Sequence, residues 1–106
     1  MQNIIREAPE VAEAFFKMTK AIDQQSPYDL KTKELMLVGI FTAHNAVRGI
    51  KTHVERALEN GASQKEIIWV ILYALPVVGI SSITAAIKAA LEVIEEKKPV
   101  SVANNT

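Results

Sequence analysis

Residues 34–41 read ELMLVGIF, a run whose side chains are apolar on almost every side of the helix that it would form. Asp29 precedes the run and can cap a helix that we predict from Leu30 to about Thr42. A helix that is apolar all round is buried on all sides. Because a chain of 106 residues can cover only a modest core, we expect a partner subunit to cover part of this helix.

The segments on either side of this run also have helical periodicity, and no alternating run bounded by turn residues predicts a strand. We predict further helices from Pro9 to just before Ser26-Pro27, from about Asn45 to Asn60, from Ser63 to near Pro76, and from about Gly79 to Glu96. In the first of them, Val11, Phe15, Met18 and Ile22 share one face. The pattern predicts an all-α, single-domain helical bundle of about five helices over residues 1–98, with residues 99–106 as a flexible tail.

Composition and charge exclude several classes of protein. With 12 basic and 12 acidic residues the formal net charge is zero, so we expect no nucleic-acid partner and no anionic membrane partner. The most apolar stretch, residues 67–80, is too short to span a membrane and is interrupted by Pro76. The N-terminus has no long apolar run of a signal peptide. We therefore expect a soluble, cytoplasmic protein.

The stretch HNAVRGIKTH, residues 44–53, is bracketed by the only two histidines of the chain. At about 100° per residue, Ala46, Gly49 and His53 fall together on one flank of the apolar arc of their helix. Ala46 and Gly49 have the smallest side chains of that helix, so the helix surface beside His53 has almost no side-chain volume. Two interpretations follow, a contact with another helix or the wall of a small pocket.

A metal centre or a bound cofactor has little support in the sequence. The chain has no cysteine, which excludes disulfides, thiolate zinc sites and thiol redox chemistry. His44 and His53 are nine residues apart and lack the i, i+4 spacing that pairs two histidines on a helix face. We expect His44 to be a surface or capping residue, and we predict no metal and no cofactor. A metal-dependent enzyme that uses His44, His53 and an acid is the weaker alternative.

Three further residues carry two interpretations each. Glu34 follows two lysines near a helix start, where a glutamate is usually solvated and interacts favourably with the helix dipole. Alternatively, Glu34 lies at the bottom of a pocket and forms a hydrogen bond with His53, which would orient the ring. Trp69 and Tyr73, four residues apart, form either a flat wall of that pocket or part of the core.

The segment LKTKELMLVGIFTA, followed by HVERALENGASQKEI, resembles the carboxymuconolactone decarboxylase family, which also includes the alkylhydroperoxidase D-type proteins. The resemblance covers about Leu30 to Leu75. It consists of a K-x-x-E-L-type helix, a histidine, and then A-L-x-N-G-A-x-x-x-E-I. The peroxidase-type members carry a C-x-x-C pair before the histidine, and its two positions are Ala46 and Gly49 here. Both thiols are missing, so a peroxidase with an attacking and a resolving cysteine cannot operate.

The chain resembles the decarboxylase-type members more closely, because these members need no cysteine pair. The resemblance implies an all-helical subunit in a homo-trimer or homo-hexamer, with pockets near subunit contacts. It also implies a cofactor-free reaction on a small carboxylated lactone or a similar carboxylate. His53 matches the family's histidine and would act as general acid/base, and Glu34 matches its proton-relay glutamate. The residue that binds the substrate carboxylate stays open, with Lys33 or a neighbouring subunit as options. The alternative is a scaffold or small-molecule-binding protein that has lost the chemistry.

Overall fold

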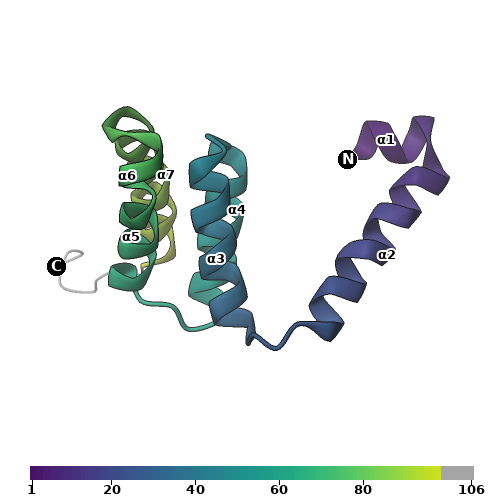
Figure 1. The fold of residues 1–106 in the computed structure, drawn as a ribbon, viewed down its shortest axis with the longest axis horizontal. Helices are drawn as coiled ribbons and strands as arrows, with labels where there is room; N and C mark the ends of the chain where they lie inside the picture. Colours follow the sequence, from purple (N-terminus) through teal and green to yellow (C-terminus); the bar gives the residue numbers. More distant parts are fainter. Residues whose placement is uncertain (99–106) are drawn as a thin grey trace, which may run out of the picture.

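The computed structural model describes residues 1–98, and within that range it contains only helices and the segments that connect them. The helices are α1 (Gln2–Glu7), α2 (Pro9–Gln25), α3 (Leu30–Ala43), α4 (Val47–Glu59), α5 (Gln64–Tyr73), α6 (Leu75–Val78) and α7 (Ile80–Lys97), as Figure 1 shows. The predicted all-α class is confirmed. The five predicted helices correspond to α2, α3, α4, α5 and α7, whereas the short α1 and the single turn of α6 were not predicted. The predicted tail, residues 99–106, lies outside the described residues.

Helix ends lie where the local signals predict them. The backbone N–H of Thr32 donates to Asp29 Oδ1 at 2.7 Å, and this interaction lowers the pKa of Asp29. Ser63 and Glu66 form both hydrogen bonds of a capping box at the start of α5. Gly61, with φ of +91°, ends the preceding helix in the left-handed conformation that glycine adopts at little cost. The sequence therefore sets the boundaries of α3, α4 and α5 through contacts within one helical turn.

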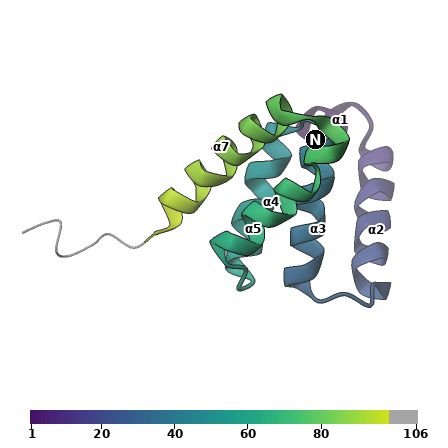
Figure 2. The ribbon, with the colours of Figure 1, turned by 60° about the vertical axis from the view of Figure 1, so that its left-hand side comes forward.

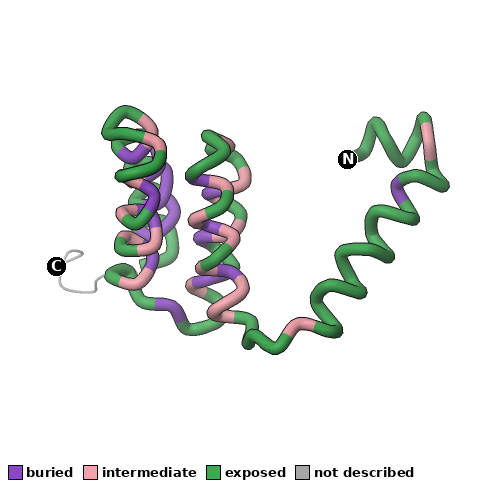
Figure 3. The backbone as a smooth tube through the Cα atoms, viewed as in Figure 1, coloured by how far each residue is buried: buried purple, intermediate pink, exposed green. Residues whose placement is uncertain are grey.

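Helices α3 to α7 form the bundle, and its core lies between α3, α4, α5 and α7. Figure 3 shows the buried positions on the facing sides of these helices. The largest fully buried side chains are Val38, Thr42, Ile50, Val54, Ile67, Ile71 and Ile83. Helix α3 is buried on its side toward the other helices, whereas Met36 and Ile40 on its outer side are exposed. Within one subunit the helix is therefore not buried on all sides. Burial of its outer side by a partner subunit stays a prediction.

Helices α1 and α2 form an arm that stands apart from the bundle (Figures 1 and 2). The arm is joined to α3 by residues 26–29, and extensive packing of α2 involves only α1. The Cα radius of gyration is 16.1 Å, whereas a compact domain of this length has about 13 Å. Ala12, between α1 and α2, is the one buried residue of the arm. The arm thus has no core of its own beyond that contact.

None of the helices in residues 1–98 is both long enough and apolar enough to cross a membrane.

Candidate functional site

Glu34 and His53 lie opposite each other where α3 packs against α4. His53 Nδ1 is 2.6 Å from Glu34 Oε2, and the side chains are 13% and 4% exposed, respectively. Of the two interpretations of Glu34, the solvated one does not describe this subunit, because the carboxylate is buried against the histidine. Residues that are 19 positions apart in the sequence are therefore brought into direct contact by the packing of two helices.

The contact also defines which nitrogen of His53 is available for chemistry. An ionised carboxylate only accepts hydrogen bonds, so a proton on Nδ1 is the arrangement that satisfies Glu34. Such a partner fixes the ring orientation and the tautomer of a histidine. Nε2 then remains as the nitrogen that can take up or release a proton. A histidine oriented by a carboxylate in this way has the geometry that general acid/base chemistry requires.

The ring of Phe41 covers one face of the His53 ring. The two ring centroids are 5.0 Å apart and the planes differ by 11°, a stacked arrangement. Gly49 makes room for this ring, because a Cβ atom at position 49 would lie 2.7 Å from Phe41 Cε1. For Gly49 the structure therefore favours the packing interpretation, since an aromatic ring of the same subunit occupies the space beside it. Ala46, at the N-cap of α4, is partly buried.

We expect Gly49→Ala to lower the free energy of unfolding by about 1–2 kcal/mol, although alanine is the better helix former. The reason is that the new methyl group overlaps the Phe41 ring. Denaturant unfolding measures the effect. In a Phe41→Leu background the same substitution should cost at least about 0.5 kcal/mol less, because the ring is gone. A Gly49→Ala protein as stable as the parent chain would contradict the packing described here.

A lysine extends the charged cluster on the other side of Glu34. Lys33 Nζ lies 3.0 Å from Asp23 Oδ1 at the end of α2 and 3.7 Å from Glu34 Oε1. These contacts join four side chains in a row from the arm to the site. Their order is Asp23, Lys33, Glu34 and His53. Lys33, one of the options for binding a substrate carboxylate, already contacts two acids of its own subunit.

Trp69 and Tyr73 are exposed, at 54% and 80%, so the prediction that placed them in the core of the subunit is wrong. The inward face of α5 is taken by Ile67 and Ile71, and residues two positions further on point about 160° away from them. Tyr73 lines a surface groove between α3 and the α5–α6 segment, and His53 and Glu34 are not among the residues of that groove. The role of both aromatic residues as pocket walls stays a prediction.

His44 is exposed, as the surface interpretation predicts, and it is the C-cap residue of α3. Within residues 1–98 no three side chains of histidine, cysteine, aspartate or glutamate gather closely enough to hold a metal ion. The alternative that joins His44, His53 and an acid in one metal site therefore has no geometric support. Lys51 of α4 forms an ion pair of 2.8 Å with Glu92 of α7, and this contact raises the pKa of Lys51.

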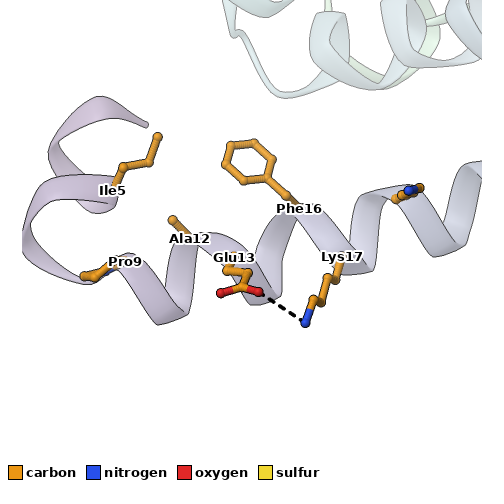
Figure 4. A pocket seen from close by; sticks show the side chains of 7 residues that line it. Ile5, Pro9, Ala12, Glu13, Phe16 and Lys17 are labelled. Carbon is orange, nitrogen blue, oxygen red and sulfur yellow. Dashed lines mark ion pairs between the residues drawn. The ribbon is translucent and has the colours of Figure 1, made fainter.

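A hollow of about 380 Å³ lies between α1 and α2, remote in the sequence from the histidine site (Figure 4). Its lining is mostly apolar, and Figure 4 shows Ile5 and Phe16 on the side opposite Glu13 and Lys17. Glu13 and Lys17 pair with each other at 3.3 Å. The hollow contains no histidine, and its acid is already paired, so it does not compete with the Glu34–His53 pair as a catalytic site.

Phe41 is the site residue that the sequence reasoning missed. A signal was present, because Phe41 follows Glu34 by seven residues and so lies on the same face of α3. Phe41 lies two turns beyond Glu34. Once the face of α3 toward α4 was known, Phe41 could have been predicted to lie on that face. The sequence could not show that the Phe41 ring stacks on His53.

An all-helical bundle in which Glu34 contacts His53, in a chain without cysteine, defines the class of this protein as a cysteine-less helical protein with a largely buried glutamate–histidine pair. Residues 9–92 match the carboxymuconolactone decarboxylase family, and the chain belongs to that family. No match was found among curated proteins. The match covers α2 to most of α7, so it includes α2 of the arm, most of the bundle and both Glu34 and His53, but not α1.

Proposed function

We propose that this protein is a cofactor-free lyase, a decarboxylase or isomerase acting on a small carboxylated lactone or a related acid. His53 is the general acid/base and Glu34 orients it. The observation that supports this function is the 2.6 Å contact between His53 Nδ1 and Glu34 Oε2 in a largely buried position. Membership of the carboxymuconolactone decarboxylase family supports the same class of reaction.

The proposed reaction needs no metal and no organic cofactor. The bond between the substrate carbon and its carboxylate breaks, and carbon dioxide leaves. The electron pair of that bond passes into the conjugated carbonyl of the lactone, which gives an enolate. Nε2–H of the protonated His53 then protonates carbon, and solvent restores the proton. A positioned acid of this kind contributes on the order of 10²–10⁴ in rate.

Lys33 is the residue of this subunit that we propose for binding the substrate carboxylate. Its ammonium group is 3.7 Å from Glu34 Oε1, which places a positive charge beside the acid/base pair. Its contact with Asp23 is 3.0 Å long and both side chains are partly exposed. A substrate carboxylate could therefore replace the Asp23 carboxylate without leaving the lysine unpaired.

The second candidate is a scaffold or small-molecule-binding protein that has lost catalysis. One observation favours it, namely that Lys33 already contacts two acids of its own subunit. A thiol peroxidase of the two-cysteine type is disfavoured because the chain has no cysteine. We further propose that the protein is a homo-trimer or homo-hexamer, as the resemblance to the family implies.

The test is carbon dioxide release from a panel of carboxylated lactones and β-keto acids, with the parent protein beside His53→Ala. We expect release from at least one lactone and a loss of on the order of 10²–10⁴-fold in His53→Ala. Circular dichroism shows whether the variant remains helical. Release that does not depend on His53 would contradict the proposed role of His53. No release from any compound, together with binding of one of them, would favour the non-catalytic candidate.

A further inference from the structure

Asp23 lies in the last turn of α2, where its carboxylate is unfavourably placed for the helix itself. Helix α2 ends at Gln25, and its last turn contains no basic residue. The C-terminal end of a helix carries partial negative charge, so an acidic side chain is disfavoured there and a basic one is favoured. The local structure of α2 thus gives no reason for an acid at position 23. Departures from such local rules are found mainly at functional sites.

The partner of Asp23 is Lys33 of α3. The two charged groups are 3.0 Å apart, and their side chains are 43% and 24% exposed, respectively. Among residues 1–98 this is the only ion pair between the arm and the bundle. Helix α2 packs extensively only against α1, and it diverges from α3 toward its N-terminal end (Figure 1). The pair can therefore open to solvent without disturbing the core of the bundle.

The other acid beside Lys33 is held much more firmly. Lys33 Nζ is 3.7 Å from Oε1 of Glu34, whose carboxylate is buried and whose Oε2 contacts His53 at 2.6 Å. Moving Glu34 away from Lys33 would also break its contact with His53 and leave a buried charge without its partner. A carboxylate that arrives from solvent can thus take the place of Asp23 but not that of Glu34.

We propose that Asp23 sets the affinity of this site for carboxylates, because it occupies the Lys33 ammonium in the free protein and is displaced by the carboxylate of the substrate. The inference rests on the proposed function, in which Lys33 binds that carboxylate. It adds that the chain carries its own competitor for the lysine. Asp23 touches no reacting atom and acts only through Lys33. A neutral lactone offers Lys33 no charge in exchange, so it leaves the Asp23–Lys33 pair closed.

The strength of an ion pair determines the size of the expected effect. A partly exposed pair changes an equilibrium constant by no more than about fivefold. Removing the Asp23 carboxylate should therefore tighten the binding of a small carboxylate by about two- to fivefold. The effect should be largest at low ionic strength, where charges are screened least.

The experiment is an NMR titration at low ionic strength that gives the Kd of γ-carboxy-γ-butyrolactone for the parent protein and for Asp23→Asn. Loss of carbon dioxide from this probe would leave a carbanion that is not conjugated with the ring carbonyl, so binding is measured apart from turnover. We expect a Kd about two- to fivefold lower in Asp23→Asn. In the parent protein the backbone amide signal of Asp23 should shift on binding. The primary amide of the probe should bind both proteins equally.

Glu10→Gln is the matched control. It removes the same charge from an exposed position in the first turn of α2, so it should leave the Kd unchanged. In a Lys33→Gln background Asp23→Asn should have no effect, because the residue through which Asp23 acts is gone.

Three results would overturn the proposal. The first is equal or weaker binding of the probe by Asp23→Asn, and weaker binding would show that Asp23 holds Lys33 in place for the ligand. The second is the same tightening in the Lys33→Gln background. The third is no binding by either the parent protein or Asp23→Asn. Tighter binding by Asp23→Asn without carbon dioxide release from any lactone would instead support the competition and contradict only the proposed reaction.

Discussion

His53→Leu should lower the free energy of unfolding by about 3 kcal/mol, because it leaves the buried Glu34 carboxylate without its closest partner. It should also lower the rate of the proposed reaction by on the order of 10²–10⁴-fold, because the proposed general acid/base is gone. Only Lys33, at 3.7 Å, would remain beside the carboxylate. Removing one member of a buried pair costs more free energy of unfolding than the pair itself contributes, because the remaining group is still shielded from water and has lost its hydrogen-bond partner. Denaturant unfolding at neutral pH measures the loss.

The control for this prediction removes both members. In Glu34→Leu/His53→Leu two apolar side chains face each other across α3 and α4, next to Phe41. Replacing both partners of a buried polar pair by apolar groups can be nearly neutral, so most of the lost stability should return. The rate of the proposed reaction should stay as low in the double variant as in His53→Leu. A double variant as unstable as His53→Leu would show that His53 contributes through packing with Phe41 and not through Glu34.

The second large effect is expected in the core of the bundle. Ile71 is fully buried on the inward face of α5, so Ile71→Ala should lower the free energy of unfolding by about 2–5 kcal/mol. The cost has two parts, the lost transfer of apolar groups from water and the cavity that the neighbouring helices cannot fill. The whole stability of a domain is about 5–15 kcal/mol, so a large share would be lost.

Lys65→Ala is the matched control for Ile71→Ala. Lys65 lies on the same helix and is exposed, so its replacement should change the free energy of unfolding by no more than about 0.5 kcal/mol. Thermal unfolding followed by circular dichroism compares the two variants. A cost below about 1 kcal/mol for Ile71→Ala would be incompatible with a fully packed position.

The helices themselves were predictable because their signals are local. The caps at Asp29 and Ser63 and the turn at Gly61 act within one turn of a helix, and each lies where the sequence predicts. Helix α1 has no capping side chain, and α6 is a single turn that contains Pro76. Neither has the length from which periodicity can be recognised, so both were missed.

The candidate site was predictable only in part. The identities of Glu34 and His53 came from the resemblance to the family, and the helical wheel placed His53 beside Gly49. The wheel could not show that Phe41 fills the space beside Gly49, because that depends on a ring from another helix. Likewise, the spacing of Trp69 and Tyr73 predicts that they share a face of α5 but not that this face is the exposed one.

The sequence by itself determined the all-α class, the ends of the main helices and the absence of thiol chemistry, because these depend on residue types and on neighbours within about four positions. Only the tertiary structure decided that the buried carboxylate of Glu34 contacts His53 and that Phe41 stacks on the imidazole ring. It also decided that the apolar face of α2 stays exposed in its own subunit. That face consists of Val11, Phe15, Met18 and Ile22. Those features depend on how whole helices cross and on where the arm leaves the bundle. Such contacts join residues far apart in the chain, and a local pattern carries no information about the angle between two helices.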